Sequence, residues 1–247
     1  LLDDAASYRL DLPGIDAALR AGARGVLLCN PHNPVGLVHS REELERLSEI
    51  VAEHDGFVVS DEIHAPLTHH GTKFTPYLSV SDAAREHGVA AESGSKAFNL
   101  AGLKTAMFVV DSEPMTRWLE QLPDEVSYRT GSFGLLATRE GFRDSLDWLD
   151  ETITAIQDNT ELLEREVSEK LPGVVVRRGH ATYLAWLDMR ALGWGDDPAA
   201  YALEHAGVAL SNGPIFGDAG KGFARINLAC APETVVEAVD RLSRAAH

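Results

Sequence analysis

Residues 25–60 read GVLLCNPHNPVGLVHSREELERLSEIVAEHDGFVVS, and this stretch decides the fold class. It begins and ends with short runs of apolar residues, 25–29 and 57–60, which predict two buried strands. The segment between them, 40–54, combines a capping box with an apolar stripe at helical spacing and therefore predicts a helix. Its signals are the pair Ser40 and Glu43 and the stripe Leu44, Leu47, Ile50 and Val51. Continuous apolar strands separated by amphipathic helices are typical of an α/β fold with a parallel sheet covered on both faces.

The rest of the chain extends this pattern and then departs from it. Residues 142–171 carry apolar side chains at intervals of three and four with no Gly or Pro, so they predict one long connecting helix. The other expected elements are a helix at 15–23, strands at 89–92, 105–111, 174–177, 182–189, 208–210 and 224–228, and helices at 198–206 and 232–244. We therefore expect three parts: a large α/β domain with a mostly parallel sheet over 1–141, the connecting helix over 142–171, and a small α+β domain over 172–247.

The composition argues against several classes of function. The 22 Lys and Arg residues against 38 Asp and Glu residues give a net charge of −16, and no stretch is basic enough to follow a nucleic-acid backbone. No apolar run approaches the roughly 20 residues that cross a bilayer. Cys29 and Cys230 lie far apart and outside any CxxC pair, which favours a reducing, cytoplasmic compartment. The chain begins at Leu1 without the features of a secretory signal, so we expect it to be part of a longer protein.

Two clusters of polar residues directly follow the first two strands. Residues 30–36, NPHNPVG, form a stiff turn that either presents the Asn33 amide in fixed geometry or is only a turn. Residues 60–64, SDEIH, place Asp61 at a strand end, where a carboxylate is either functional or simply a helix cap or a solvated loop residue. His64, together with His69 and His70, lacks the spacing of a metal motif, so we expect no metal site.

A third cluster, residues 92–104, reads ESGSKAFNLAGLK. Lys96 is one of only five lysines in the chain, against 17 arginines, and it lies between small and apolar residues. Such surroundings favour a desolvated amine that can form a Schiff base, although a surface lysine remains the alternative at this point.

The order of these motifs carries a family resemblance. In five motifs the chain resembles fold-type I pyridoxal-phosphate enzymes of the aminotransferase class I/II group. These motifs are Asn-Pro-x-Gly at Asn33, Asp-x-x-His at Asp61, Ser-x-x-Lys at Lys96, a second cation eight residues later, and a late Arg-Ile-Asn at Arg225. The flanking residues around His32 and 61–65 are similar to the MalY/PatB-type cystathionine β-lyases. The family's N-terminal arm and the first part of its large domain have no counterpart in this sequence.

The resemblance implies a role for each matched residue. Lys96 would hold pyridoxal 5'-phosphate covalently and act as general base. Asp61 would keep the pyridinium nitrogen protonated. Asn33 would bond the phenolic oxygen of the cofactor, and His64 falls where many relatives use a tyrosine for that oxygen. The phosphate would be held by Ser93 and by Lys104, which stands where an arginine is common and lacks its two-pronged geometry.

Arg225 matches the arginine that binds the substrate α-carboxylate, with a structural ion pair as the alternative. For Tyr183 and Trp186, alternation along a strand predicts core positions. The loop 211–217 would border the substrate.

The resemblance implies an α,β-elimination on cystathionine or a related cysteine thioether, a small amino-acid substrate, that gives a thiol, pyruvate and ammonia. It also implies a homodimer. An aminotransferase of the same fold is the first alternative, and a non-catalytic regulatory or binding protein derived from this fold is the second.

Overall fold

The computed structural model describes residues 1–3 and 8–246. Its chain divides into two compact units. The large unit comprises Leu1–His32 and Leu37–Asp150, and the small unit comprises Asn33–Gly36 and Glu151–His247. The segment Asn33–Gly36 therefore leaves the large unit and joins the small one, although its neighbours on both sides in the sequence belong to the large unit.

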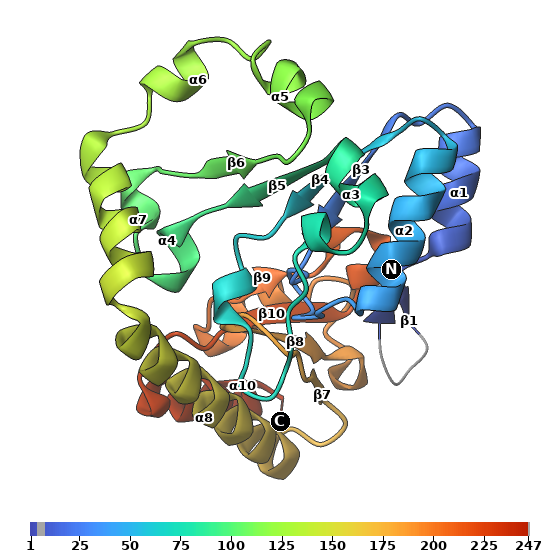
Figure 1. Ribbon diagram of the computed structural model, residues 1–247. Helices are drawn as coiled ribbons and strands as arrows, with labels where there is room; N and C mark the ends of the chain where they lie inside the picture. Colours follow the sequence, from blue (N-terminus) through green and yellow to red (C-terminus); the bar gives the residue numbers. More distant parts are fainter. Residues whose placement is uncertain (4–7, 247) are drawn as a thin grey trace. The chain divides into compact units, whose positions relative to one another are not determined.

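The large unit is built on a four-stranded sheet in the order β3-β4-β5-β6 (Figure 1). Its strands are β3 (Gly25–Cys29), β4 (Phe57–Asp61), β5 (Gly88–Glu92) and β6 (Met107–Val109). β3, β4 and β5 are parallel, and β6 runs antiparallel to β5. The expected α/β fold with a mostly parallel sheet is thus confirmed, while the strand expected over 105–111 shortens to three residues.

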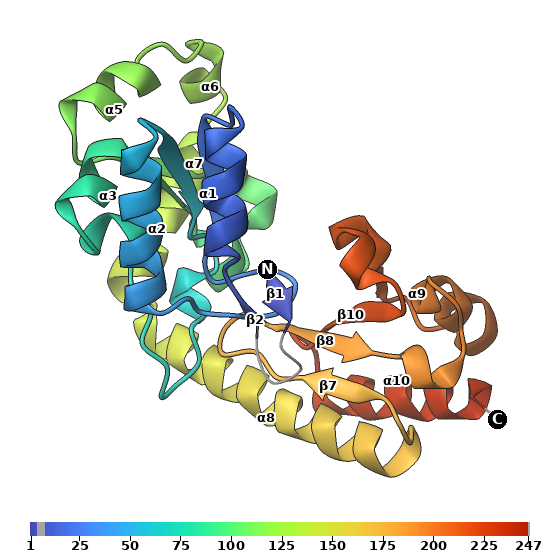
Figure 2. The ribbon, with the colours of Figure 1, turned by 90° about the vertical axis from the view of Figure 1, so that its right-hand side faces the viewer.

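Helices α1 (Leu12–Arg20) and α2 (Arg41–Glu53) lie side by side against this sheet (Figure 2). The predicted capping box of α2 is present, since Ser40 and Glu43 bond reciprocally. α1 starts earlier than the expected 15–23, because Asp11 accepts the Gly14 N–H and caps the helix there. The remaining elements of this unit are β1 (Leu2–Asp3), β2 (Tyr8–Arg9), α3 (Asp82–His87), α4 (Gly94–Ala97), α5 (Glu113–Leu119), α6 (Glu125–Tyr128), α7 (Ser132–Asp144), and 3₁₀ turns Ala65–Leu67, Tyr77–Ser79 and Ala101–Leu103.

The long helix α8 spans Leu146–Lys170 and not the expected 142–171. Ser145 leaves the helical conformation at φ −123° and ends α7. Residues 142–144 therefore belong to α7 and not to α8. A periodic apolar pattern continues across such a break, because two successive helices can share one stripe.

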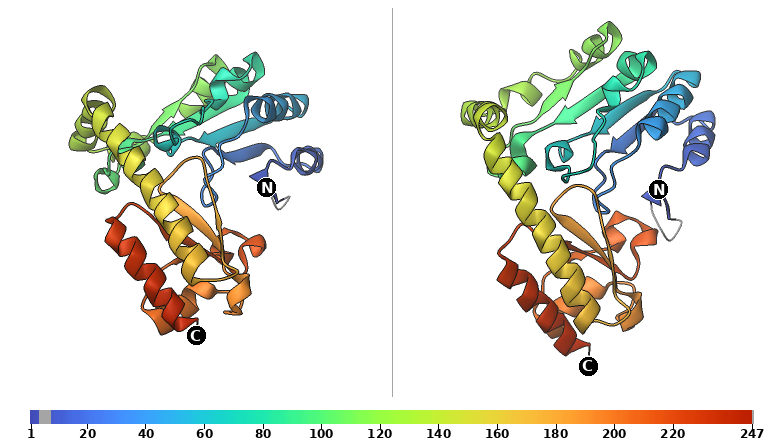
Figure 3. Two further views of the ribbon diagram at one scale, coloured as in Figure 1. Left: turned by 90° about the horizontal axis from the view of Figure 1, so that it is seen from below. Right: turned by 60° about the horizontal axis from the view of Figure 1, so that its bottom comes forward.

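The small unit has a four-stranded antiparallel sheet in the order β7-β8-β10-β9. Its strands are β7 (Val175–Arg177), β8 (Leu184–Asp188), β9 (Ser211–Asn212) and β10 (Phe223–Asn227). Helix α10 (Pro232–Ala245) lies beside α8 (Figure 3), and both helices contribute to one core with β8 and β10. Lys170 joins the two helices through an ion pair of 2.6 Å with Asp240.

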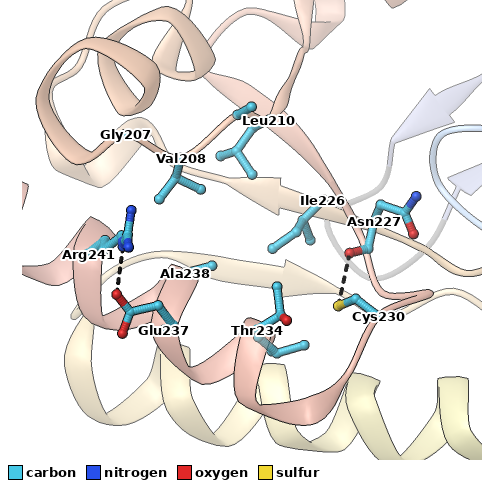
Figure 4. A pocket seen from close by; sticks show the side chains of 12 residues that line it. Gly207, Val208, Leu210, Ile226, Asn227, Cys230, Thr234, Glu237, Ala238 and Arg241 are labelled. Atoms are coloured by element: carbon cyan, nitrogen blue, oxygen red, sulfur yellow. Dashed lines mark hydrogen bonds and ion pairs between the residues drawn. The ribbon is translucent and has the colours of Figure 1, made fainter.

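The helix expected over 198–206 is confirmed, with α9 (Pro198–Tyr201) passing into a π-helical turn over Ala202–Ala206. The strand expected over 208–210 is wrong, since these residues form no strand. The Val208 N–H bonds to the Ala202 carbonyl, which closes this turn instead of extending β9. A cavity of about 360 Å³ lies between Val208, Leu210 and Ile226 (Figure 4). The other turns are the 3₁₀ segments Arg190–Leu192, Pro214–Phe216 and Asp218–Gly220. Within the described residues, no helix is long and apolar enough to cross a bilayer.

Candidate active site

The carboxyl ends of the parallel strands bring two of the predicted clusters together in the large unit. In register, Asp61 at the end of β4 lies opposite Ala91 near the end of β5. His64 follows the first of these strands, and Ser93 and Lys96 follow the second. This edge of an open α/β sheet is where ligands bind.

Asp61 is half-buried, and its Oδ1 accepts the Ile63 N–H at 3.2 Å. It does not cap a helix, because the next helical turn, Ala65–Leu67, has His64 at its N-cap position. The cap alternative for Asp61 is therefore wrong. His64 itself is buried.

Two further carboxyl groups lie beside Asp61, and the motif analysis missed both. Glu62 is 1 % exposed, and its Oε1 accepts the Ser60 hydroxyl and the Tyr77 N–H, each at 2.8 Å. Burial raises the pKa of Glu62. At the end of β5, burial raises the pKa of Glu92 to about 7, with smaller contributions from the nearby Glu62 and Asp61. One sequence feature could have identified Glu62 and Glu92: each carboxyl group lies at or just after the end of a strand that is otherwise mostly apolar.

Lys96 lies in the short helix α4, which Ser93 caps by accepting the Ser95 N–H at 3.0 Å. The Lys96 side chain is half-buried, and in the described part of the chain nothing forms an ion pair or hydrogen bond with it. The Ser93 hydroxyl is buried and donates to the Thr105 carbonyl at 2.7 Å. Lys104, which precedes Thr105 in the sequence, is exposed and takes a left-handed conformation at φ 53°.

Helix α7 supports the α4 turn through two glycines. A Cβ on Gly134 would come within 1.9 Å of Thr105 Oγ1, and a Cβ on Gly141 within 2.8 Å of the Phe98 ring. The two glycines lie seven residues apart, which places them on one face of the helix. The segment that carries Lys96 therefore packs against α7 at distances that only glycine allows.

Arg225 in the small unit has a set of neutral partners. Its Nη1 donates to Asn33 Oδ1 at 2.7 Å and its Nη2 to Ser211 Oγ at 3.0 Å. The guanidinium carbon lies 5.0 Å from the centre of the Phe216 ring. Burial lowers the pKa of Arg225. No acidic side chain of residues 1–3 or 8–246 pairs with it, so the described residues give no support to the structural ion-pair alternative.

Asn33 is held next to Arg225 by the turn that contains His180. The His180 N–H donates to the Gly36 carbonyl at 2.8 Å, and a Cβ on Gly179 would lie 2.7 Å from the Gly36 Cα. The segment 33–36 is therefore more than a turn, because it docks on the small unit and fixes the Asn33 amide.

His32, just before Asn33, keeps its imidazole neutral. Burial lowers its pKa to about 4, and the nearby His39 contributes. The pKa of His39 is also lowered by burial, and its Nε2 lies 3.3 Å from the Cys29 carbonyl. Both imidazoles are therefore neutral at pH 7.

Trp186 is buried between two aromatic rings, Phe216 and Phe223, which confirms its expected core position. Tyr183 differs from the expectation: it is half-buried, does not belong to the core cluster, and interacts electrostatically with Arg225. The loop 211–217 borders Arg225 through Ser211 and Phe216.

The large unit has a mostly parallel α/β sheet with Asp61 and Lys96 beyond its strand ends, and the small unit carries Arg225 in its antiparallel sheet. The chain belongs to the aminotransferase class I and II family, whose sequence profile matches residues 1–242. It is 41 % identical over 261 residues to a Mycobacterium tuberculosis protein that bears the provisional name cystathionine beta-lyase, covering 96 % of this chain and 63 % of that protein. The cystathionine beta-lyase PatB of Bacillus subtilis is 34 % identical, with 99 % of this chain and 64 % of that protein covered.

Cystalysin from Treponema denticola, whose crystal structure contains a pyridoxal 5'-phosphate cofactor, superposes with a TM-score of 0.92 at 28 % identity. The match covers 99 % of this chain and 63 % of that one. The resemblance to the MalY/PatB branch is thus confirmed. The chain spans somewhat less than two thirds of the length of these relatives.

Proposed function

We propose that the protein is a pyridoxal 5'-phosphate-dependent carbon–sulfur β-lyase that acts on cystathionine or a related cysteine thioether. The observation that carries the proposal is the environment of Arg225, a half-buried guanidinium whose partners in the described residues are all neutral. A buried cation without a counter-ion is costly, and a planar two-pronged donor matches a carboxylate. The names of the relatives above support an amino-acid substrate with a thioether.

The residues named by the resemblance fit the cofactor chemically. In the large unit, Asp61 offers a carboxylate oxygen for the ring nitrogen, and Lys96 offers an amine that no described residue engages. Ser93 and Lys104 offer a hydroxyl and an ammonium group for the phosphate, and His64 offers its imidazole for the phenolic oxygen. In the small unit, Asn33 offers its amide for that same oxygen. When bound, the cofactor supplies the electron sink that stabilises negative charge at the substrate Cα.

The chain's own residues would then divide the remaining work. Arg225 fixes the α-carboxylate, and Asp61 holds a proton on the ring nitrogen through its negative charge. Lys96 Nζ removes the Cα proton. The Cβ–S bond breaks, the thiolate leaves with the electron pair, and water converts the remaining three carbons and the amine to pyruvate and ammonia.

One assay separates this reaction from transamination, the alternative in the same fold. The protein is incubated with cystathionine, and pyruvate and free thiol are measured; in parallel an added keto acid is offered with an amino donor. We expect pyruvate and thiol in equal amounts and little amino transfer. Conversion of the keto acid without pyruvate release from any thioether would establish an aminotransferase, and no cofactor binding at all would favour the non-catalytic regulatory alternative.

We further infer a homodimer in the cytoplasm. Large apolar side chains are exposed on the large unit, Tyr128 and Phe133 at about 80 %, and neither Cys29 nor Cys230 forms a disulfide within the described residues. Light scattering of the purified protein measures the mass directly, and a monomer at micromolar concentration would refute the dimer.

A further inference from the structure

Thr182 has a backbone conformation that is rare for its residue type. Its φ is +71°, in the left-handed region that β-branched residues avoid. The residue is 1 % exposed, and its own hydroxyl accepts the Leu184 N–H at 3.1 Å, which stabilises the turn. Strained backbone of this kind persists where the surrounding structure holds it, and such sites cluster near functional groups.

The next residue, Tyr183, departs from the burial pattern that alternation along β8 predicts. In register, Trp186 lies opposite Arg225, so these two side chains share one face of the sheet. Alternation along β8 sends Ala185 and Leu187 to the other face, where both are buried in the core. Tyr183 would follow Ala185 and Leu187 if the strand were regular, yet it is half-buried and outside that core.

The Tyr183 phenol and the Arg225 guanidinium interact electrostatically, and each alters the pKa of the other. The Tyr183 carbonyl accepts the Leu228 N–H at 2.8 Å, which ties this residue to the end of β10. The same turn, 179–182, packs against Gly36 and thereby holds the Asn33 segment. Residues 179–183 therefore position both Asn33 and Tyr183, two residues that interact with Arg225.

We propose that Tyr183 is a further substrate-contacting residue, whose hydroxyl donates a hydrogen bond to the α-carboxylate that Arg225 binds. The inference rests on the proposed function. Burial raises the pKa of Tyr183 above its ordinary value of 10.0, and the opposing effect of Arg225 is smaller, so the phenol keeps its proton and remains a donor at neutral pH. The expected ligand is an amino acid with a free carboxylate, and amines that lack the carboxylate gain nothing from this contact.

The test compares two ligands in three proteins. L-alanine and ethylamine differ by the carboxylate, and their binding is followed through the visible spectrum of the bound cofactor. In Tyr183→Phe we expect the affinity for L-alanine to fall about tenfold, as for loss of one hydrogen bond to a charged group, with the affinity for ethylamine unchanged. Tyr201→Phe is the matched control, because Tyr201 is half-buried in the same unit but stacks on Trp194, 4.5 Å away.

Equal weakening of both ligands in Tyr183→Phe would assign the residue a structural role only and overturn the proposal, as would unchanged affinity for both. A KM for S-methyl-L-cysteine that rises about tenfold with little change in kcat would agree with a binding contact. A wild-type protein without any cofactor band would instead refute the proposed function. In that case propionate, titrated without cofactor and observed by NMR line broadening, still decides: broadening must decrease in Tyr183→Phe, and no decrease overturns the proposal.

Discussion

Arg225 Nη1 and Asn33 Oδ1 lie 2.7 Å apart and join residues separated by 192 positions in the sequence. The bond places the guanidinium expected at the substrate carboxylate directly against the amide expected at the phenolic oxygen of the cofactor. Both residues belong to the small unit, because the segment Asn33–Gly36 docks there. Under the proposed function, substrate binding and cofactor binding would therefore share one hydrogen-bonded pair.

The first prediction concerns Arg225. Arg225→Lys keeps the charge but loses the planar fork, so we expect kcat/KM for cystathionine to fall about 100-fold. Pyruvate release measures the effect. Arg244→Lys, on the exposed end of α10, is the control and should retain wild-type activity; equal activity in both variants would remove Arg225 from the substrate site.

The second prediction concerns Lys96. The covalent bond of its amine to the cofactor should give an absorbance band near ~420 nm, which Lys96→Ala abolishes together with the activity. Lys73→Ala, at an exposed position, should keep the band. A wild-type band in Lys96→Ala would place the anchor elsewhere.

The third prediction concerns Asp61. Asp61→Asn keeps the shape of the side chain and removes its charge, so we expect cofactor to remain bound while transition-state stabilisation falls by about 3 kcal/mol or more. Turnover at saturating substrate and cofactor content by absorbance give the two quantities. Asp218→Asn, in a surface turn of the small unit, serves as the control. Unchanged turnover in Asp61→Asn would leave the carboxylate with only its bond to the Ile63 N–H.

The fourth prediction uses the titration of Glu92. Its folded pKa of about 7 lies above the ordinary value of 4.5, so the protonated carboxyl stabilises the fold at low pH and this contribution is lost as the pH rises to about 7. Glu92→Gln should therefore be more stable than the wild type at pH 8, by about 1–2 kcal/mol, relative to the difference at pH 4.5. Urea unfolding at the two pH values measures it, with the exposed Glu86→Gln as control. A pH-independent difference would show that Glu92 titrates normally.

The fifth prediction concerns the packing of helix α7 against the segment that carries Lys96. Gly134→Ala places a Cβ 1.9 Å from Thr105 Oγ1 and 2.8 Å from the Leu103 carbonyl. We expect a loss of roughly 2 kcal/mol of unfolding free energy although alanine favours helices, together with weaker cofactor binding. Gly102→Ala has nothing within 4 Å of the added Cβ and should be neutral. Equal stability of both variants would mean that α7 shifts to accommodate the added Cβ and does not hold the segment that carries Lys96 in place.

The sequence alone was sufficient for the fold class and the family. Local hydrophobic periodicity and helix capping predict the strands 25–29 and 57–60 and the helix between them. These patterns can be identified without knowing which segments pack together. The order of the Asn33, Asp61, Lys96 and Arg225 motifs is likewise a property of the linear chain, and the family match confirmed it. The break at Ser145 was not visible, because the apolar stripe continues across it.

Only the tertiary structure decided which groups meet. Among the described residues, Arg225 has no acidic partner, and it bonds to Asn33 nearly 200 positions away, a contact for which the sequence has no local signal. The raised pKa of Glu92 arises from burial beside Glu62 and Asp61 on neighbouring strands. Tyr183 was expected in the core from alternation, and a single left-handed residue, Thr182, accompanies its departure from that pattern. Local sequence patterns determine the helices and strands. The burial of a side chain and its distance from other charged groups determine its protonation state and reactivity, and both arise only when distant segments pack together.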